Sequence, residues 1–284
     1  MLFNHDTPGI IFYDGAMGTM LQKRGLKPGD MPDLMNISKP DAVYEVHKLY
    51  IEAGSDIICT NTFGANCYAL RDTGYTTDDV ISSAVSIAKR AVRDTGGHTK
   101  IALDIGPIGL LLEPFGDLEI EKAIEMFARQ AIAGEKTGAD LVAIETMGDL
   151  NEMEAAIKAV TGNTKLPVLA TMTFDKAGRT YMGVSTESFV KLAEELGVCA
   201  LGMNCSLEPK EIYPVAQKLA GETKLPLIFK LNAGLPDGAT GEYTVGPREY
   251  ALQLLPYKDL GMKIVGGCCG TSPEYIAELK KQFG

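Results

Sequence analysis

The sequence contains no apolar run approaching the roughly 18 residues that a membrane-spanning helix needs. Residues 1–6 include no basic segment followed by an apolar stretch, so we expect no signal peptide. The basic residues form no cluster, and the formal net charge of −10 repels nucleic-acid phosphates and anionic lipid. These absences predict a cytoplasmic protein with no nucleic-acid partner and no membrane partner.

Histidine is scarce, with three residues in 284, and the chain has neither a Cys-x-x-Cys nor a His-Glu-x-x-His motif. Any metal site in this chain is therefore expected to use residues outside these two motifs. The chain does contain six cysteines. In a reducing cytosol, metal binding or catalysis is a commoner role for cysteine than disulfide formation.

Apolar β-rich runs alternate with stretches of helical period, in a chain that is 45% hydrophobic and 23% charged. The runs are nearly continuous in apolar residues, as expected of parallel strands covered on both faces. The expected strands are residues 9–14, 56–61, 100–105, 140–145, 167–173, 200–204, 226–231 and 263–267. The expected helices are about 41–53, 79–94, 118–136, 149–160, 186–196, 209–219, 247–256 and 273–282. This count favours a single (β/α)₈ TIM barrel over residues 1–284 rather than an open doubly wound sheet.

A repeated unit supports the barrel. Four expected helices end at a glycine, which suits the left-handed conformation that stops a helix. Seven residues beyond Gly54, Gly138, Gly197 and Gly261 stand Asn61, Glu145, Asn204 and Cys268. Asp14 and Asn232 fit the same level, where the active site of such a barrel is built. The alternative is that these residues are polar only because strand ends are polar in most folds.

Three cysteines fall at this level. Cys205 follows the sixth expected strand, and Cys268 and Cys269 follow the eighth. Three converging thiolates suit a tetrahedral soft metal and leave one position open for a substrate. Adjacent residues on a strand point to opposite faces, so the pair can share one ion only if the strand has already broken into a loop. The competing interpretation, buried free cysteine, is the one we expect for Cys59, Cys67 and Cys199.

Seven motifs stand in order along nearly the whole chain: Asp14-Gly-Ala-Met-Gly-Thr, Asn61-Thr-Phe-Gly-Ala-Asn, Gly106-Pro-Ile-Gly, Glu145-Thr-Met, Gly202-Met-Asn-Cys-Ser, Asn232-Ala-Gly-Leu-Pro and Gly266-Gly-Cys-Cys-Gly. With these motifs the chain resembles the homocysteine S-methyltransferase family, and most closely the homocysteine domain of cobalamin-dependent methionine synthase. Two departures occur: Leu231 replaces a frequent proline, and Leu207-Glu208-Pro209 replaces a turn that commonly contains glycine. Neither touches a proposed ligand, although Glu208 is close enough to Cys205 to affect the metal or the choice of donor.

The resemblance implies a Zn²⁺ ion on Cys205, Cys268 and Cys269, and a homocysteine thiol that becomes its fourth ligand. Asp14 and Glu145 would bind the ammonium group, and the amides of Gly15, Ala16 and Met17 would bind the carboxylate. Asn232 would lie at the edge of the zinc site, and Asn61 would be a further substrate-binding residue. A thiol is mostly protonated at neutral pH, and coordination to zinc removes that proton.

The methyl donor implied by the closest branch is methylcobalamin or a related corrinoid. The chain contains no Asp-x-His-x-x-Gly cobalamin motif, so we expect a separate corrinoid protein as partner. One alternative is an S-methylmethionine-dependent homocysteine methyltransferase, which needs no such partner. Another is a non-catalytic zinc-barrel subunit, and a thiol other than homocysteine is a further alternative. The sequence leaves open the oligomeric state and the surface on which a corrinoid protein would dock.

Overall fold

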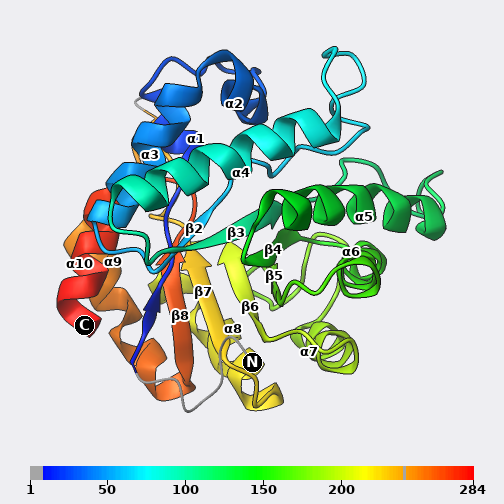
Figure 1. Cartoon of the computed structure of the whole chain (residues 1–284). Helices are drawn as coiled ribbons and strands as arrows, with labels where there is room; N and C mark the ends of the chain where they lie inside the picture. The colour runs from blue at the N-terminus through cyan, green and yellow to red at the C-terminus, as the bar shows by residue number, and fades with distance from the viewer. Residues whose placement is uncertain (1–8, 239–240) are drawn as a thin grey trace.

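The structure, a computed structural model, describes residues 9–238 and 241–284 and forms the predicted barrel. Residues 1–6, on which the signal-peptide expectation depends, lie outside this range. Eight parallel strands form one sheet in the order β1-β8-β7-β6-β5-β4-β3-β2 (Figure 1). Their bounds are β1 Ile11–Phe12, β2 Ile57–Cys59, β3 Lys100–Ile105, β4 Leu141–Met147, β5 Val168–Met172, β6 Ala200–Cys205, β7 Leu227–Leu231 and β8 Met262–Gly267. Every predicted strand is confirmed, and β1 and β2 are shorter than expected.

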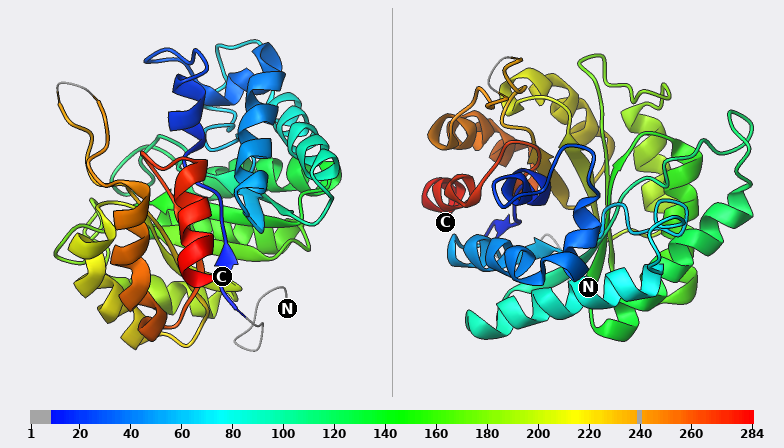
Figure 2. Two further views of the ribbon diagram at one scale, coloured as in Figure 1. Left: turned by 90° about the vertical axis from the view of Figure 1, so that its left-hand side faces the viewer. Right: turned by 90° about the horizontal axis from the view of Figure 1, so that it is seen from above.

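Helices surround the sheet and cover the outer faces of its strands (Figures 1 and 2). The eight predicted helices correspond to α3 Pro40–Glu52, α4 Thr77–Asp94, α5 Ile120–Thr137, α6 Leu150–Asn163, α7 Thr186–Glu195, α8 Pro209–Glu222, α9 Pro247–Leu254 with the 3₁₀ turn η2 Leu255–Leu260, and α10 Pro273–Phe283. Three short elements between β1 and α3 were not predicted: α1 Met17–Gln22, η1 Pro32–Leu34 and α2 Met35–Ser38. They lie over the carboxyl end of the barrel, at the top of Figure 1.

Glycine ends the helices where the sequence predicts it. Gly54, Gly138, Gly197 and Gly261 all have positive φ, between 74° and 105°. A residue with a Cβ is strained in that conformation, so these positions fix where each helix stops and the next strand begins. The common spacing of seven residues then brings the polar residues that follow to one end of the barrel.

The barrel interior contains its own apolar cluster, separate from the larger core between strands and helices. Inward-facing residues alternate with outward-facing ones along each strand. The interior cluster comprises Ile11, Tyr13, Ile57, Cys59, Ala102, Leu141, Ala143, Leu169, Ala200, Ile228 and Ile264. Two residues further along three of these strands stand Asp104, Glu145 and Lys230. The same alternation that fills the barrel therefore points these charged side chains into its upper layer.

Carboxylates help to close the seam between β1 and β2. The backbone bridge between Tyr13 and Ile57 and a hydrogen bond of 2.7 Å from the Asp56 amide to the Phe12 carbonyl join the two strands. The Phe12 amide donates to Asp56 Oδ2 at 2.8 Å, and the Cys59 amide donates to Asp14 Oδ2 at 2.7 Å. These two side chains accept hydrogen bonds that a longer ladder would direct to backbone carbonyls. Asp14 thus contributes to closing the barrel.

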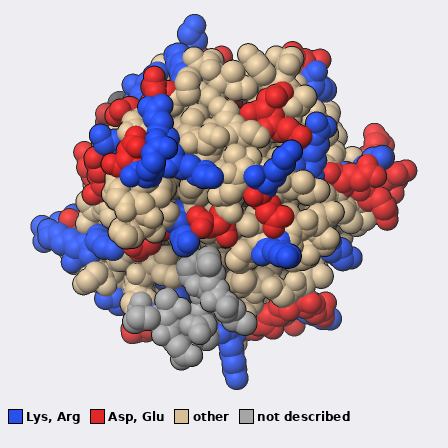
Figure 3. All heavy atoms as spheres, viewed as in Figure 1, with Lys and Arg blue, Asp and Glu red and all other residues tan. Residues whose placement is uncertain are grey.

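Charged side chains of both signs lie on the surface, and acidic and basic ones are interleaved over the face seen in Figure 3. Within residues 9–238 and 241–284, no helix is both long enough and apolar enough to cross a membrane.

The expectation that Cys59, Cys67 and Cys199 are buried in the core is right only for Cys59. Cys67 is exposed, because it lies in the irregular segment between β2 and α4 rather than on a strand. Cys199 is partly buried just before β6, where it packs against the interior cluster.

Gly202 allows β6 and β7 to lie next to each other, and replacing it tests this packing. A Cβ added at Gly202 would lie 1.9 Å from the Ile228 carbonyl oxygen, so we expect Gly202→Ala to force the strands apart. The expected loss is about 3 kcal/mol in the free energy of unfolding, measured by urea denaturation. Gly221→Ala in α8 is the control, since nothing lies within 4 Å there and alanine favours a helix. Equal stability of the two variants would contradict this packing.

Candidate active site

A cavity of about 480 Å³ opens at the carboxyl end of the barrel. The predicted site residues that line it are Gly15, Ala16, Met17, Asn61, Glu145, Cys205, Cys268 and Cys269. Asp14 and Asn232 are not among its lining residues, and both are buried beside it. The cavity is also lined by Cys59, Asp104 and Lys230, which the sequence analysis did not assign to a site.

Three thiols converge on one wall of this cavity. The Sγ atoms of Cys205, Cys268 and Cys269 all lie within 4.8 Å of one another, and Cys205 Sγ is 3.9 Å from Cys269 Sγ. A tetrahedral zinc ion with Zn–S bonds of about 2.3 Å places two sulfurs about 3.8 Å apart. The spacing of these sulfurs therefore fits one tetrahedral ion that keeps a fourth position free.

Irregular backbone lets the three cysteines face one point. β8 ends at Gly267, so Cys268 and Cys269 lie in the loop beyond the strand, as the sequence analysis required. Cys205 is the last residue of β6 and has a φ of +59°, and the next residue, Ser206, has a φ of +65°. A non-glycine residue is strained in this left-handed region. The Ser206 hydroxyl donates to the Phe174 carbonyl and the Asn232 amide donates to the Ser206 carbonyl, and these two bonds anchor the strained turn.

The thiols hold their protons tightly when no cation is near. A hydrogen bond with Cys268 lowers the pKa of Cys205, but the bond with Cys269 and burial outweigh it and raise that pKa to about 11. At Cys269 a hydrogen bond with Cys205 lowers the pKa, but the bond with Cys268 and burial outweigh it and raise that pKa to about 12. Three neighbouring thiols resist ionisation because each anion repels the next. A divalent cation removes that repulsion, which is the second respect in which this donor set fits a metal.

Asn204 supports both the thiol wall and the acidic side of the cavity. Its Oδ1 accepts hydrogen bonds from the Thr146 amide and the Thr171 hydroxyl, both at 2.8 Å. Its Nδ2 donates to Thr146 Oγ1 at 2.7 Å and faces Cys268 Sγ at 3.9 Å. Thr146 has a φ of +64°, and the register of β4 against β5 shifts around it. This irregularity, held by Asn204, helps to set the direction of the neighbouring Glu145.

A buried ion pair lies on the cavity floor. Lys230 Nζ is 2.7 Å from Glu145 Oε2 and 3.9 Å from Asp14 Oδ1, and it lies 4.2 Å from the centre of the Tyr13 ring. Burial alone lowers the pKa of the Lys230 ammonium, but the acidic groups around it, Cys59 and Glu145 foremost, raise that pKa well above its usual range. Lys230 therefore carries its charge, and Glu145 already has a cationic partner before any ligand enters.

Asp14 lies behind the cavity wall, only 1% exposed. Burial raises its pKa from 3.8 to about 7, against the opposing attraction of Lys230 and the hydrogen bond from the Cys59 amide. Its Oδ1 is buried and has no hydrogen-bond partner within the described part of the chain. Asp14 thus combines a structural contact to β2 with an unsatisfied oxygen directed toward Lys230.

The remaining predicted residues have structural partners that narrow their roles. The Ala16 amide donates to Thr271 Oγ1 at 3.1 Å, so it is already engaged. Asn61 Nδ2 donates to the Pro32 carbonyl at 2.7 Å and so ties β2 to the segment above the cavity. Asn232 Nδ2 donates to the Ser206 carbonyl at 2.9 Å, while its Oδ1 is buried without a partner among the described residues. Glu208, close to Cys205 in sequence, accepts a hydrogen bond from Gln253 on α9.

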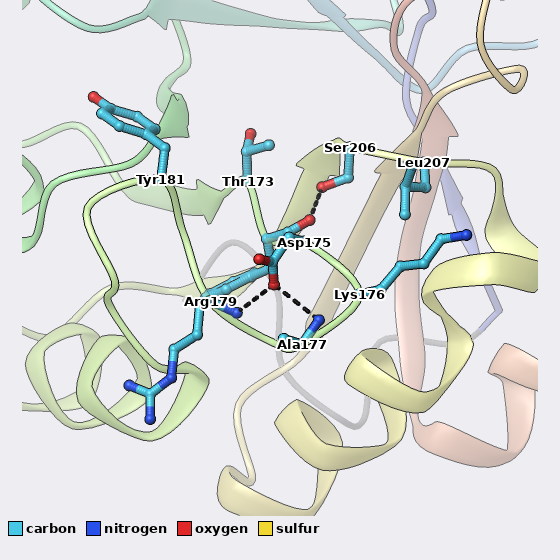
Figure 4. A pocket seen from close by; sticks show the side chains of 9 residues that line it. Thr173, Asp175, Lys176, Ala177, Arg179, Tyr181, Ser206 and Leu207 are labelled. Atoms are coloured by element: carbon cyan, nitrogen blue, oxygen red, sulfur yellow. Dashed lines mark hydrogen bonds between the residues drawn. The ribbon is translucent and has the colours of Figure 1, made fainter.

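A second hollow, of about 720 Å³, is lined by the loop after β5 and by Ser206 and Leu207, which follow Cys205 in the chain. Figure 4 shows it on the loop after β5, with Tyr181 at one side and Leu207 at the other. Asp175 Oδ1 accepts from the amides of Ala177 and Arg179, which fixes the loop. Ser206 donates to the Phe174 carbonyl, and Ser206 directly follows Cys205. None of the three site cysteines lines this hollow, so Ser206 is its link to the thiol wall along the chain.

Lys230 and Asp104 are two charged cavity residues on strands that the sequence analysis missed; Asp30 and Asp33, which also line the cavity, were not predicted either. Lys230 and Asp104 each interrupt an otherwise apolar strand, in Pro-Leu-Ile-Phe-Lys-Leu and Ile-Ala-Leu-Asp-Ile. A charge inside a buried strand is costly unless it is paired, so it signals a functional or structural partner. Cys59 was interpreted as a core residue; it is buried, but it also lines the cavity.

Comparison with known proteins places this geometry in a family. The sequence model of the homocysteine S-methyltransferase family matches residues 11–283. The methionine synthases of Mycobacterium leprae (strain TN) and Mycobacterium tuberculosis (strain ATCC 25618 / H37Rv) are 33% and 32% identical, each over 95% of this chain. The chain spans 24% of the length of each of these relatives. The metallated homocysteine methyltransferase MmuM from Escherichia coli superimposes with a TM-score of 0.83 at 25% identity, covering 98% of this chain and 97% of that one.

The raised pKa of Asp14 makes stability depend on pH. The folded protein binds this proton more tightly than the unfolded chain, so its free energy of unfolding falls as pH rises from about 4 to about 7 and is level above. Asp14→Asn keeps an acceptor for the Cys59 amide but does not titrate. Between pH 5 and pH 8, we expect metal-free wild type to lose on the order of 2 kcal/mol more than the variant in urea unfolding. Parallel pH profiles would contradict the assignment.

Proposed function

The chain belongs to the homocysteine S-methyltransferase family, and on that premise we propose that it transfers a methyl group to the thiol of L-homocysteine, giving methionine. The observation that carries this proposal is the position of the three cysteine thiols on one wall of a cavity whose floor holds Glu145 and Lys230. A thiol acceptor needs a site that activates sulfur, and an amino acid needs charged groups nearby. This cavity offers both.

Cys205, Cys268 and Cys269 are proposed to hold a zinc ion, with their sulfur spacing and tetrahedral preference as support. When bound, zinc supplies a Lewis acid that makes the substrate thiol ionise near neutral pH. Three protein ligands, rather than four, leave the coordination position that a reacting group requires. Asn204, facing Cys268 Sγ, orients one thiol through its amide hydrogen.

The amino-acid part of homocysteine is proposed to bind across the cavity from the cysteines. Glu145 faces the substrate ammonium directly, and Asp14 contributes from behind the wall through its attraction to Lys230. The Ala16 amide is occupied by Thr271, so the carboxylate is assigned to the amides of Gly15 and Met17. Asn232 directs an unsatisfied Oδ1 near the thiol loop and is proposed to mark the edge of the metal site. Asn61 shapes the cavity by holding the Pro32 segment above it.

The reaction is an in-line displacement. A lone pair of the homocysteine sulfur forms a bond to the methyl carbon, and the bond between that carbon and the donor breaks with its electron pair left on the donor. The residues of this chain hold the sulfur at a fixed position and in a fixed direction. This lowers the entropic cost of bringing the sulfur and the donor methyl group together. Placing the sulfur on a wall reached from the open end of the barrel leaves its far side accessible to the donor.

The donor is proposed to be a methyl-corrinoid, such as methylcobalamin, bound to a protein outside this chain. Two findings support this choice: the resemblance of the chain to the homocysteine domain of cobalamin-dependent methionine synthase, and its 33% and 32% sequence identity with two mycobacterial methionine synthases. S-methylmethionine is the alternative donor. The near-complete overlap with a homocysteine methyltransferase of similar length, MmuM, favours such a single-chain reaction.

Replacing the cysteines one at a time tests the metal site. We expect Cys205→Ser, Cys268→Ser and Cys269→Ser each to weaken zinc binding at least about 100-fold, because a hydroxyl is a poor ligand for this ion. Cys67→Ser, at an exposed cysteine outside the cavity, should bind zinc like wild type. The measurement is competition with a chromogenic chelator under reducing conditions. Wild-type zinc affinity in any of the three variants would remove that cysteine from the site.

A methyl-donor panel tests the reaction. Zinc-loaded protein with homocysteine should form methionine from methylcobalamin, and S-methylmethionine should be at least about tenfold slower, since the proposed donor is a corrinoid. Turnover of S-methylmethionine without turnover of methylcobalamin would overturn the donor and keep the acceptor. X-ray absorption at the zinc edge provides the control: homocysteine should add a sulfur ligand in a catalytic site, and an unchanged spectrum with no turnover would indicate a non-catalytic barrel.

A further inference from the structure

A second group of metal-ligating atoms lies below the three thiols. Among the described residues, Cys59, Asp104 and Glu145 each offer one ligand atom, and these atoms lie within 4.8 Å of one another. All three residues line the cavity, and they come from the ends of β2, β3 and β4. A thiolate with two carboxylates is a donor set that zinc and similar divalent ions accept.

The ammonium group of Lys230 lies against this group of atoms. Its Nζ is 2.7 Å from Glu145 Oε2 and 3.7 Å from Cys59 Sγ. Lys230 comes from β7, on the opposite side of the barrel, and its side chain is 5% exposed. The lysine therefore reaches across the interior and places a positive charge where a metal ion would bind.

The floor has more acceptor capacity than Lys230 uses. Asp104 Oδ1 and Asp14 Oδ1 are both buried, and within the described ranges neither has a hydrogen-bond partner. Burial, and then repulsion from Glu145, raise the pKa of Asp104 well above its usual range, while the Lys230 charge opposes this rise. Unsatisfied buried acceptors next to one cation indicate a floor built to receive further positive charge.

We propose that Lys230 is a specificity-determining residue whose ammonium group keeps a second divalent metal ion out of the Cys59, Asp104 and Glu145 cluster. Zinc is thereby confined to the three-thiol wall, and the floor is left to a single positive charge. This inference rests on the proposed function in one respect, since the charge that the floor then accepts is the ammonium of the substrate.

Charge and space both support this role. A divalent ion within reach of Cys59 and Glu145 would lie a few ångströms from the Lys230 ammonium and be repelled by it. Lysine is a compact point charge, so it can occupy the place of an ion without coordinating one. A substrate ammonium carries half the charge of a metal ion and can share the carboxylates with Lys230. The same group therefore rejects a metal and tolerates an amino acid.

A merely structural ion pair is the competing explanation, and the two differ in what happens when the charge is removed. If Lys230 only stabilises the barrel, Lys230→Met lowers stability and leaves metal binding unchanged. If Lys230 excludes a metal, the variant gains a second site made by Cys59, Asp104 and Glu145. Lys230→Arg retains the charge and separates charge from side-chain identity.

The experiment measures bound metal after loading with excess Zn²⁺ or Cd²⁺ and gel filtration under reducing conditions. We expect about one ion per chain in wild type and Lys230→Arg, and about two in Lys230→Met. The double variant Lys230→Met with Cys59→Ser should return to about one, because the second site loses its thiolate. Lys176→Met is the matched control, since Lys176 pairs with Glu211 at the same 2.7 Å but on the surface. An unchanged ratio in Lys230→Met would overturn the proposal.

A second variant covers the case in which Lys230→Met does not fold. Removing the three-thiol wall by Cys205→Ala, Cys268→Ala and Cys269→Ala, with Lys230 intact, should leave a protein with no tight Cd²⁺ binding and no cadmium–thiolate absorption. Such absorption from Cys59 would contradict the proposal. The ratio of bound metal to protein is measured without homocysteine. If homocysteine is not the methyl acceptor, only the methyl-donor panel fails, and the metal ratios still test the role of Lys230.

Discussion

The direction of side chains along parallel strands is the constraint on which this site depends. Every second residue of a strand faces the inside of the barrel, and eight strands in register bring those residues together in layers. The lower layers are apolar and include Cys59, and the layer above them contains Asp104, Glu145 and Lys230. A shift of one residue in any strand would turn its polar side chain outward into the helices. The chemistry of the cavity is therefore a direct product of the register that builds the fold.

Charge inside the barrel is acceptable because it is paired. An isolated buried carboxylate or ammonium is strongly destabilising, whereas a hydrogen-bonded pair offsets much of that cost. The contact of 2.7 Å between Lys230 and Glu145 provides such a pair, and the Tyr13 ring adds a polarisable surface below the ammonium. The thiol wall differs, because its three cysteines carry no net charge while they are protonated.

Sequence alone predicts the barrel because its signals are local. Apolar runs and helix-stopping glycines repeat along the chain, and counting from those glycines places Glu145 and Cys268 at one level. The contact between Lys230 and Glu145 is not local: it joins β7 to β4 across the interior, and only the closed barrel shows that the two meet. Asp14 illustrates another limit, since its sequence motif indicates a ligand contact while packing places it behind the cavity wall. Likewise, the short helices above the cavity lack the repeated apolar period that identifies longer ones.

The seam between β1 and β2 has a dynamic consequence. The seam has one backbone bridge, whereas β2 and β3 pair at three positions, and the Asp14 and Asp56 carboxylates supply two of its hydrogen bonds. Local opening begins where backbone hydrogen bonding is sparse, so amide hydrogen exchange in this barrel should be fastest at the seam. The loop at Gly15 continues directly from β1, and Glu145 stands on β4 beyond the seam. A small molecule in contact with both Gly15 and Glu145 would connect the two sides of this seam. Its binding and the local opening of the barrel would therefore be coupled.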